Sequence, residues 1–224
     1  MKIIVMSCSK NWVLFEPFHH CMEKYWPDHP EVVYYTDDEI NPYYKTIAIP
    51  HELNHWTTGL REFLRKIDDD QVLFMIDDCF IRRPVDTKRV DEASAILSHE
   101  PNVACMNFEL SWDNRDEPTI YSGWKKRKHG SAYEVSLMCG LWQKDKLIDV
   151  VSRDCDPWTI EIDQDNRGYD YYINSDWYII DWGYRTFQPC GVVKGSWSAE
   201  CIHFLESEGL NVCYENLGKI SKCH

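Results

Sequence analysis

The feature that most constrains the fold is an apolar run, residues 72–76, that ends in two adjacent carboxylates, Asp77 and Asp78. An unbroken run with Val and Ile among its members predicts a strand buried on both faces, as in the centre of a parallel sheet. Open α/β sheets hold their ligands at the carboxyl ends of the strands, so both carboxylates are expected to face a ligand. Paired Asp oxygens suit Mg²⁺ or Mn²⁺, which in turn neutralises a diphosphate. The alternative is a solvated turn that merely follows a strand.

Length and charge narrow the class of protein. With 224 residues, the chain is expected to form one domain with a core that needs no disulfides. The net charge of −13 disfavours a general affinity for nucleic acid or acidic lipid, although a local basic patch could override it. Ten cysteines without short repeated spacings indicate reduced thiols, as in the cytoplasm. The sequence holds no transmembrane run, so we expect no membrane insertion, and residues 1–6 predict a strand rather than a leader.

Strands and helices alternate in the first half. Residues 2–6 predict a strand that opens into a polar loop, residues 7–12, and a second strand at 32–35 stops at Asp37. This alternation predicts a mostly parallel sheet, whose loops place Ser7, Trp12 and Asp37 on the same edge as the Asp pair. A helix over 56–67 carries Arg61, which could bind phosphate or could simply lie on a solvated surface.

The second half is less regular. Residues 109–132 are polar and include a basic run at 125–128, which predicts either an acceptor-side flap or solvated surface. Alternation over 133–142 predicts a strand, and Gly140 within it indicates close approach of a ligand or another backbone. Asp156 and Pro157 are typical of a helix start, and that helix carries Glu161. A last helix carries His203 and is closed by Gly209.

The order of these features resembles the GT-A type of nucleotide-sugar glycosyltransferase. The resemblance rests on the first strand and its polar loop, the second strand ending at Asp37, the run ending in Asp77-Asp78-Cys79, and residues 133–142, and it extends to about residue 165. It implies an α/β, Rossmann-type, mostly parallel sheet flanked by helices, with a nucleotide-sugar half at 1–108 and a smaller acceptor half at 109–224.

The resemblance also implies roles for individual residues. Asp78 would hold the cation and Asp77 the ribose or the donor sugar, although the family normally spaces its two carboxylates one residue apart. Ser7 and Asp37 would contact the nucleobase, and Trp12 would stack on it or pack in the core. Gly140 and Arg61 complete the set of residues expected at the donor.

Inverting transfer also needs a carboxylate that removes the proton of the acceptor hydroxyl. Glu161 is the candidate base, with Asp163 and Asp156 as competitors. His203 is a candidate second ligand of the ion, as a late histidine is in some members of the family, although a lone helical histidine is more often surface or core.

The predicted activity is therefore metal-dependent transfer of a sugar, from a UDP-sugar, to an acceptor hydroxyl. The acceptor would be a glycan or a hydroxymethylated base of phage DNA, and the acidic net charge favours the glycan. A nucleotidyltransferase is the first alternative, although the loop at 7–12 lacks the glycines and has only one lysine. A sugar-binding module is the second, with ten tryptophans and thirteen tyrosines as stacking faces.

Overall fold

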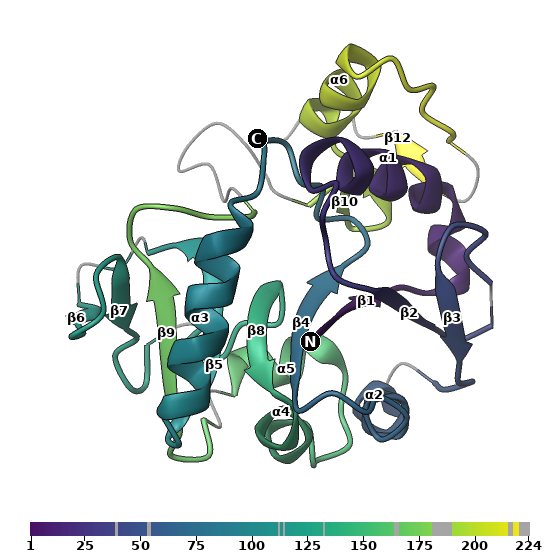
Figure 1. Cartoon of the computed structure of the whole chain (residues 1–224). Coiled ribbons are helices and arrows are strands. Elements are labelled where there is room, and N and C mark those ends of the chain that lie inside the picture. Colours follow the sequence, from purple (N-terminus) through teal and green to yellow (C-terminus); the bar gives the residue numbers. More distant parts are fainter. Residues whose placement is uncertain are drawn as a thin grey trace.

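The computed structural model describes residues 1–38, 40–52, 55–111, 113, 115–131, 133–163, 166–180, 190–214 and 217–219. Within these residues, a nine-stranded sheet forms the centre of the molecule (Figure 1). Its strands, in order across the sheet, are β3 (Lys45–Ala48), β2 (Val32–Thr36), β1 (Lys2–Met6), β4 (Gln71–Ile76), β8 (Cys139–Gln143), β5 (Val103–Leu110), β9 (Asp170–Asn174), β7 (Trp124–Lys126) and β6 (Glu117–Pro118).

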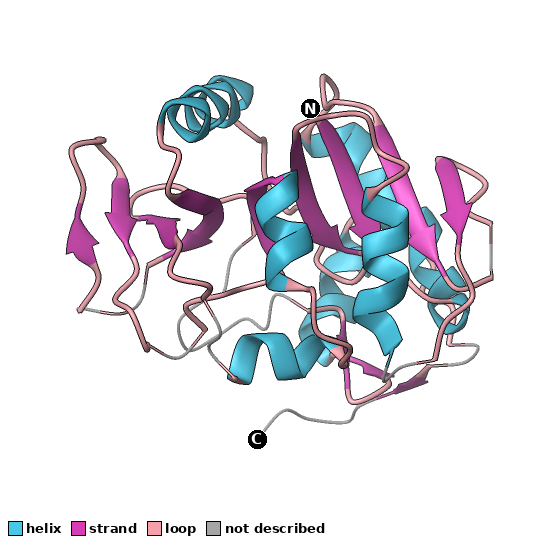
Figure 2. Ribbon diagram, turned by 90° about the horizontal axis from the view of Figure 1, so that it is seen from below, coloured by secondary structure: helices cyan, strands magenta, loops and turns pink. Residues whose placement is uncertain are grey.

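Helices cover both faces of the sheet (Figure 2). One face packs against α1 (Phe15–Tyr25), α3 (Thr87–His99) and α6 (Ala199–Ser207). The other packs against α2 (Trp56–Leu64), α4 (Lys144–Val150) and α5 (Pro157–Ile162). A 3₁₀ helix, η1 (Ser9–Leu14), joins β1 to α1. The predicted α/β class with flanking helices is confirmed.

The amino-terminal strands are parallel, as alternation of strands and helices predicts. β1 lies between β2 and β4, with Met6 opposite both Tyr35 and Ile76. The carboxyl ends of the three strands therefore meet at one edge. All residues of β2 and the four central residues of β4 are buried, because helices cover both faces.

β8 departs from the predicted parallel arrangement. It pairs antiparallel with β4, where Met75 lies opposite Cys139, and antiparallel with β5, where Asn107 lies opposite Gly140. β5 then pairs parallel with β9. The first-half strands β4 and β5 are thus separated by a strand from the second half.

The prediction of a strand over residues 133–142 is wrong at its amino-terminal end, because β8 begins only at Cys139. Tyr133 has a φ of 56°, which a strand does not allow. Residues 134–138 are all buried, so the alternation of their side chains does not correspond to a covered and an open face. The irregular stretch 109–132 contains β6 and β7, which extend the sheet at its far edge.

A small three-stranded sheet lies beside α6. It consists of β10 (Val192–Val193), β11 (Ser196–Trp197) and β12 (Gly218–Lys219). Figure 1 shows α6 next to α1, and Glu208 after α6 accepts hydrogen bonds from Lys24 and Tyr25 of α1. No helix in the described part of the chain is long and apolar enough to cross a membrane.

Candidate functional site

Asp77 lies at the carboxyl edge of β4, where the loop after β1 reaches it. Its backbone N–H donates to the carbonyl of Met6 at 3.0 Å, which continues the pairing of β1 and β4. Its Oδ2 accepts from the Ser7 hydroxyl at 2.5 Å, and its Oδ1 accepts from the Asn11 amide at 3.2 Å. The structure thus brings together the predicted residues Ser7 and Asp77, and it adds Asn11, which the sequence analysis missed.

The Asp77 carboxyl is buried, and burial together with the neighbouring charge of Asp78 raises its pKa well above the usual range. The hydrogen bonds from Ser7 and Asn11 oppose that rise, since they stabilise the charged form. Asp77 is therefore a carboxyl in a fixed orientation, and two polar side chains of the β1 loop hold it there.

Asp37 lies at the end of β2 and binds the same loop. Its carboxylate accepts from the Ser9 backbone N–H at 2.5 Å and from the Ser9 hydroxyl at 2.9 Å, at the first residue of η1. Trp12, also on η1, is 38% exposed, so its indole is open to a stacking partner rather than packed in the core. The predicted neighbours Ser7, Trp12 and Asp37 all belong to one edge of the sheet.

Asp78 is held by a segment far along the chain. Its backbone carbonyl accepts from the Gly191 N–H at 2.6 Å, and its Oδ2 accepts from the Val192 N–H at 3.2 Å. Its other oxygen, Oδ1, lies 3.7 Å from the Cys79 thiol. Burial raises the pKa of this carboxyl as well. Sequence analysis does not predict this partnership, since residues 190–192 carry no motif.

The Asp78 carboxylate can serve as one ligand of a hard divalent cation. Mg²⁺ is often held by one or two carboxylates, with phosphate oxygens and water completing its shell, and Asp78 meets that minimum. His203 is exposed on α6, and it is not part of the compact group of candidate ligand atoms that Asp78 forms among the described residues. Its role as a ligand stays a prediction.

Glu161 on α5 is a third carboxyl whose pKa is raised. Burial raises its pKa to about 7, the hydrogen bond from the Leu137 N–H at 2.8 Å acts against that rise, and the charge of Glu109 adds to it. Among its competitors, Asp156 accepts from the Thr159 N–H as the cap of α5, and Asp163 forms an ion pair with Arg153. A carboxyl with the pKa of Glu161 can exchange a proton near neutral pH.

The register of the sheet relates Glu161 to the Asp pair. Met75 of β4 lies opposite Cys139 of β8. Asp77 lies two residues beyond Met75, and Leu137, which binds Glu161, lies two residues before Cys139. Because the strands are antiparallel, both positions are at the same edge of the sheet.

Two other predicted residues have structural partners. The Arg61 guanidinium donates to the Val151 carbonyl and to Asp154, which ties α2 to the segment between α4 and α5. At Gly140, an added Cβ would lie 2.5 Å from Cys105 Sγ and 2.7 Å from Asn107 Oδ1, so the close approach is by side chains of β5. Their roles at the donor stay predictions.

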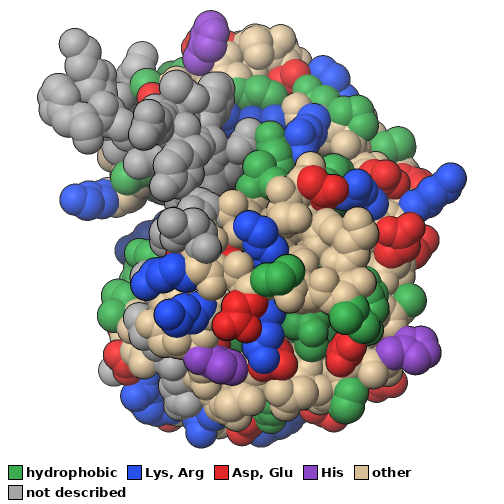
Figure 3. All heavy atoms as spheres, turned by 90° about the vertical axis from the view of Figure 1, so that its left-hand side faces the viewer, with side chains coloured by type: hydrophobic (Ala, Val, Ile, Leu, Met, Phe, Trp, Pro, Cys, Tyr) green, Lys and Arg blue, Asp and Glu red, His purple; other side chains and the backbone are tan. Residues whose placement is uncertain are grey.

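The basic run at 125–128 is not a uniform solvated surface. Lys126 forms an ion pair with Asp170 at 2.7 Å, and Arg127 is only 2% exposed. On the face that includes this edge of the sheet, Lys and Arg side chains are interspersed with Asp and Glu (Figure 3). The charge of Arg127 acts inward and lowers the pKa of Glu161.

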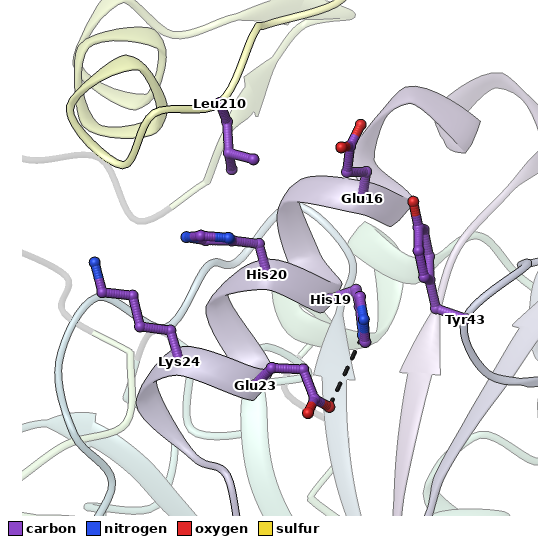
Figure 4. A pocket seen from close by; sticks show the side chains of 7 residues that line it. All are labelled: Glu16, His19, His20, Glu23, Lys24, Tyr43 and Leu210. Atoms are coloured by element: carbon purple, nitrogen blue, oxygen red, sulfur yellow. Dashed lines mark ion pairs between the residues drawn. The ribbon is translucent and has the colours of Figure 1, made fainter.

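A hollow of about 470 Å³ lies elsewhere, on the outer face of α1 (Figure 4). Tyr43 at its rim stacks on His19, with ring centroids 4.4 Å apart. The side chains that line it are Glu16, His19, His20, Glu23, Lys24, Tyr43 and Leu210. It includes none of the residues predicted for the donor or the base.

No family model matches the sequence, and no curated protein matches it either. Solved structures do match. The structure of CMP:2-keto-3-deoxy-manno-octonic acid synthetase complexed with CTP is 14% identical, with a TM-score of 0.51, and the match covers 93% of this chain and 98% of that one. Residues 1–349 of S. aureus TarS are 14% identical, with a TM-score of 0.50, over 80% of this chain and 59% of that one.

The chain has a GT-A-like fold. A further structure of TarS 1–349 is in complex with UDP. A less similar one is the mannosyltransferase PcManGT from Pyrobaculum calidifontis in complex with GDP-Man and Mn²⁺, 13% identical with a TM-score of 0.47, over 78% of this chain and 54% of that one. The chain thus spans less than two thirds of these two proteins and nearly all of the synthetase. At such identities the likeness concerns the fold.

Proposed function

We propose that the protein is a glycosyltransferase that moves a sugar from a nucleotide-sugar donor, a UDP-sugar by preference, to an acceptor hydroxyl. The observation that carries the proposal is the carboxylate pair at the end of β4. Asp77 is bound by Ser7 and Asn11 of the β1 loop, and Asp78 is bound by the 191–192 backbone. The pair lies at the carboxyl edge of parallel strands, where folds of this class bind nucleotides.

The β1 loop and the end of β2 would receive the nucleoside. Trp12 offers an exposed indole face for stacking on the base, while the Asp37 carboxylate and the Ser7 hydroxyl oxygen could each accept a hydrogen bond from the nucleobase. Asp77 would bind the ribose or the donor sugar. In this proposal Gly140 and Arg61 belong to the outer surroundings of the donor.

A Mn²⁺ or Mg²⁺ ion held by Asp78, with His203 as the proposed second ligand, would carry the charge that develops on the leaving diphosphate. The protein's own contribution is to fix the Asp78 carboxylate. The Val192 N–H binds Oδ2, and Oδ1, which contacts the Cys79 thiol, keeps a lone pair for a ligand.

Glu161 is the proposed general base. With a pKa of about 7, a large part of it is ionised at neutral pH, and it still binds a proton strongly enough to draw it from a hydroxyl. Its hydrogen bond from Leu137 fixes its orientation. The acceptor would approach along the end of β5 and the start of β8, within the half of the chain at 109–224.

A glycan, to which the enzyme would add the sugar in the cytoplasm, is the favoured acceptor, because the net charge of −13 opposes an approach to nucleic acid. A hydroxymethylated base of phage DNA is the alternative. Lys125 and Lys128 on and after β7 are the basic residues that could touch its phosphates.

Nucleotidyl transfer is the second candidate, because the synthetase matches over nearly the full length of both chains. The β1 loop weighs against it. It has no glycine and one lysine, whereas a triphosphate needs several backbone or cationic donors.

Thermal melting with a nucleotide panel tests the proposal. We expect UDP to raise the melting temperature in the presence of Mn²⁺ and to lose that effect when EDTA is added. A larger shift with CTP than with UDP would favour the nucleotidyltransferase. A shift with glycans and none with nucleotides would contradict both and would indicate a sugar-binding module.

A further inference from the structure

Two cysteines from distant parts of the chain meet beside Asp78. Cys79 at the end of β4 forms an antiparallel bridge with Cys190, just before the small sheet. A carboxylate oxygen of Asp78 and the sulfurs of Cys79 and Cys190 lie within 4.8 Å of one another. In the described part of the chain, this is the group of three side chains with that geometry.

Backbone pairing holds Cys79 and Cys190 opposite each other. The hydrogen bond of the bridge runs from the Gly191 N–H to the Asp78 carbonyl, that is, between the residues that flank the two cysteines. Cys79 and Cys190 are therefore a non-hydrogen-bonded pair, the class in which facing side chains lie closest. Gly191 allows this contact, because a Cβ there would lie 2.6 Å from the Phe80 ring.

The segment is also anchored at its other side. The Ser198 N–H, at the start of α6, donates to the Gly191 carbonyl at 2.8 Å. Cys79 is fully buried and Cys190 is half-buried. Two sulfurs and an oxygen are thus held in place by β4, β10 and α6 together.

We propose that Asp78, Cys79 and Cys190 form a binding site for a soft divalent cation of the Zn²⁺ class. Zinc bound by thiolates and a carboxylate sets its ligand atoms about 3.5 to 3.8 Å apart, the edge of a tetrahedron with the usual bond lengths. The distance of 3.7 Å between Cys79 Sγ and Asp78 Oδ1 already has that value. The Val192 N–H holds the other Asp78 oxygen, as an outer hydrogen bond commonly orients a metal-ligating carboxylate.

Three protein ligands leave the fourth position of the ion open to water or to a small ligand. Binding releases the two thiol protons to solvent, so the ion and two thiolates replace two neutral thiols. This donor set differs from the oxygen shell that Mn²⁺ and Mg²⁺ prefer. A bound soft ion would occupy the carboxylate that we assign to the hard ion, and this last consequence, unlike the binding itself, rests on the proposed function.

Titration of the reduced protein with Cd²⁺, without nucleotide, tests the site. We expect an ultraviolet thiolate-to-cadmium charge-transfer band that saturates at one ion per chain and that Zn²⁺ removes by competition. Cys190→Ser and Cys79→Ser should each lower the intensity by about half and weaken binding at least tenfold. Asp78→Asn should keep the intensity and weaken binding.

Matched controls distinguish this site from the other thiols. Cys139→Ser removes a buried thiol of β8 and Cys213→Ser a half-buried one, and both should titrate as the wild type does. If Cys79→Ser fails to fold, the half-buried Cys190 still gives the answer. No band in the wild type, or an undiminished band in Cys190→Ser, would overturn the proposal. Neither result depends on whether the protein transfers sugars.

Discussion

Asp78 and Asp77 are adjacent carboxyls with different partners. Asp77 binds side chains of the β1 loop, whereas Asp78 binds backbone N–H groups of the 191–192 segment. Both residues lie in the turn after β4, and their carboxylates have partners in different segments. Asp77 can therefore bind the donor while Asp78 binds the ion.

We predict that Asp78→Asn abolishes Mn²⁺-dependent UDP binding and transfer while the protein stays folded. The amide oxygen can still accept from the Val192 N–H, and the change removes a buried charge whose pKa burial has raised. The measurement is the thermal shift with UDP and Mn²⁺, beside the circular dichroism of each protein. Asp86→Asn is the matched control, because Asp86 caps α3 and Asn caps equally well. An undiminished shift in Asp78→Asn would remove Asp78 from the ion site.

Glu161 carries a cost in stability that its proposed role explains. Its pKa rises from 4.5 in the unfolded chain to about 7 in the folded protein. The folded state therefore binds the proton more tightly, and the contribution of Glu161 to stability is full below the lower value and is lost as pH rises to the higher one. Carboxyls with strongly raised pKa values cluster at functional sites, where they act as acids or bases.

Glu161→Gln should therefore slow turnover and stabilise the protein. We expect kcat to fall by about 10² to 10⁴ with little change in donor binding. The free energy of unfolding should exceed that of the wild type by about 3 kcal/mol at about pH 8 and by almost nothing at about pH 4. Urea unfolding at both pH values, with single-turnover kinetics, measures the two effects. Asp163→Asn is the control, since that carboxylate is exposed and ion-paired. A variant with unchanged kcat would move the base elsewhere.

At the scale of elements, β8 requires a glycine where it lies between β4 and β5. A side chain at position 140 would collide with Cys105 Sγ and Asn107 Oδ1. We predict that Gly140→Ala destabilises the protein by about 1 to 3 kcal/mol, measured by urea unfolding. The double variant Gly140→Ala, Cys105→Ala should recover part of that loss, because it removes the nearer atom. Equal stability of the single variant and the wild type would mean that β5 can move away.

At the scale of the whole molecule, the sequence predicts what depends on short-range pattern. The run at 72–76 predicts β4, and its carboxyl end predicts where Asp77 and Asp78 lie, because strand ends and ligand edges coincide in this class of fold. The cap at Asp156 is predicted for the same reason, since its partner is three residues away. The proximity of Ser7 to Asp77 is also predicted, because the loop after the first strand is expected at the same edge of the sheet as the Asp pair.

What the sequence does not predict depends on pairing between distant segments. Residues 134–138 are all buried, so no alternation of buried and exposed side chains marks where β8 begins. No local sequence pattern indicates that β8 runs antiparallel between β4 and β5, or that Cys190 pairs with Cys79. β9 pairs with β5, which lies far from it in the sequence, and the sequence analysis does not predict β9 as a strand.

The position of β8 also bears on how the chain reaches its native state. During synthesis β4 and β5 are both made before residue 139. One edge of each strand therefore has no neighbour until β8 has been made. Until then β4 presents an unpaired, apolar edge, the kind of surface on which other chains assemble. A fragment of residues 1–110 should therefore aggregate on expression, whereas the full chain, with β8 paired and α6 packed on its face of the sheet, should remain dispersed; sedimentation of the two lysates compares them. A nascent chain of this protein is accordingly a natural client for chaperones that cover strand edges before translation ends.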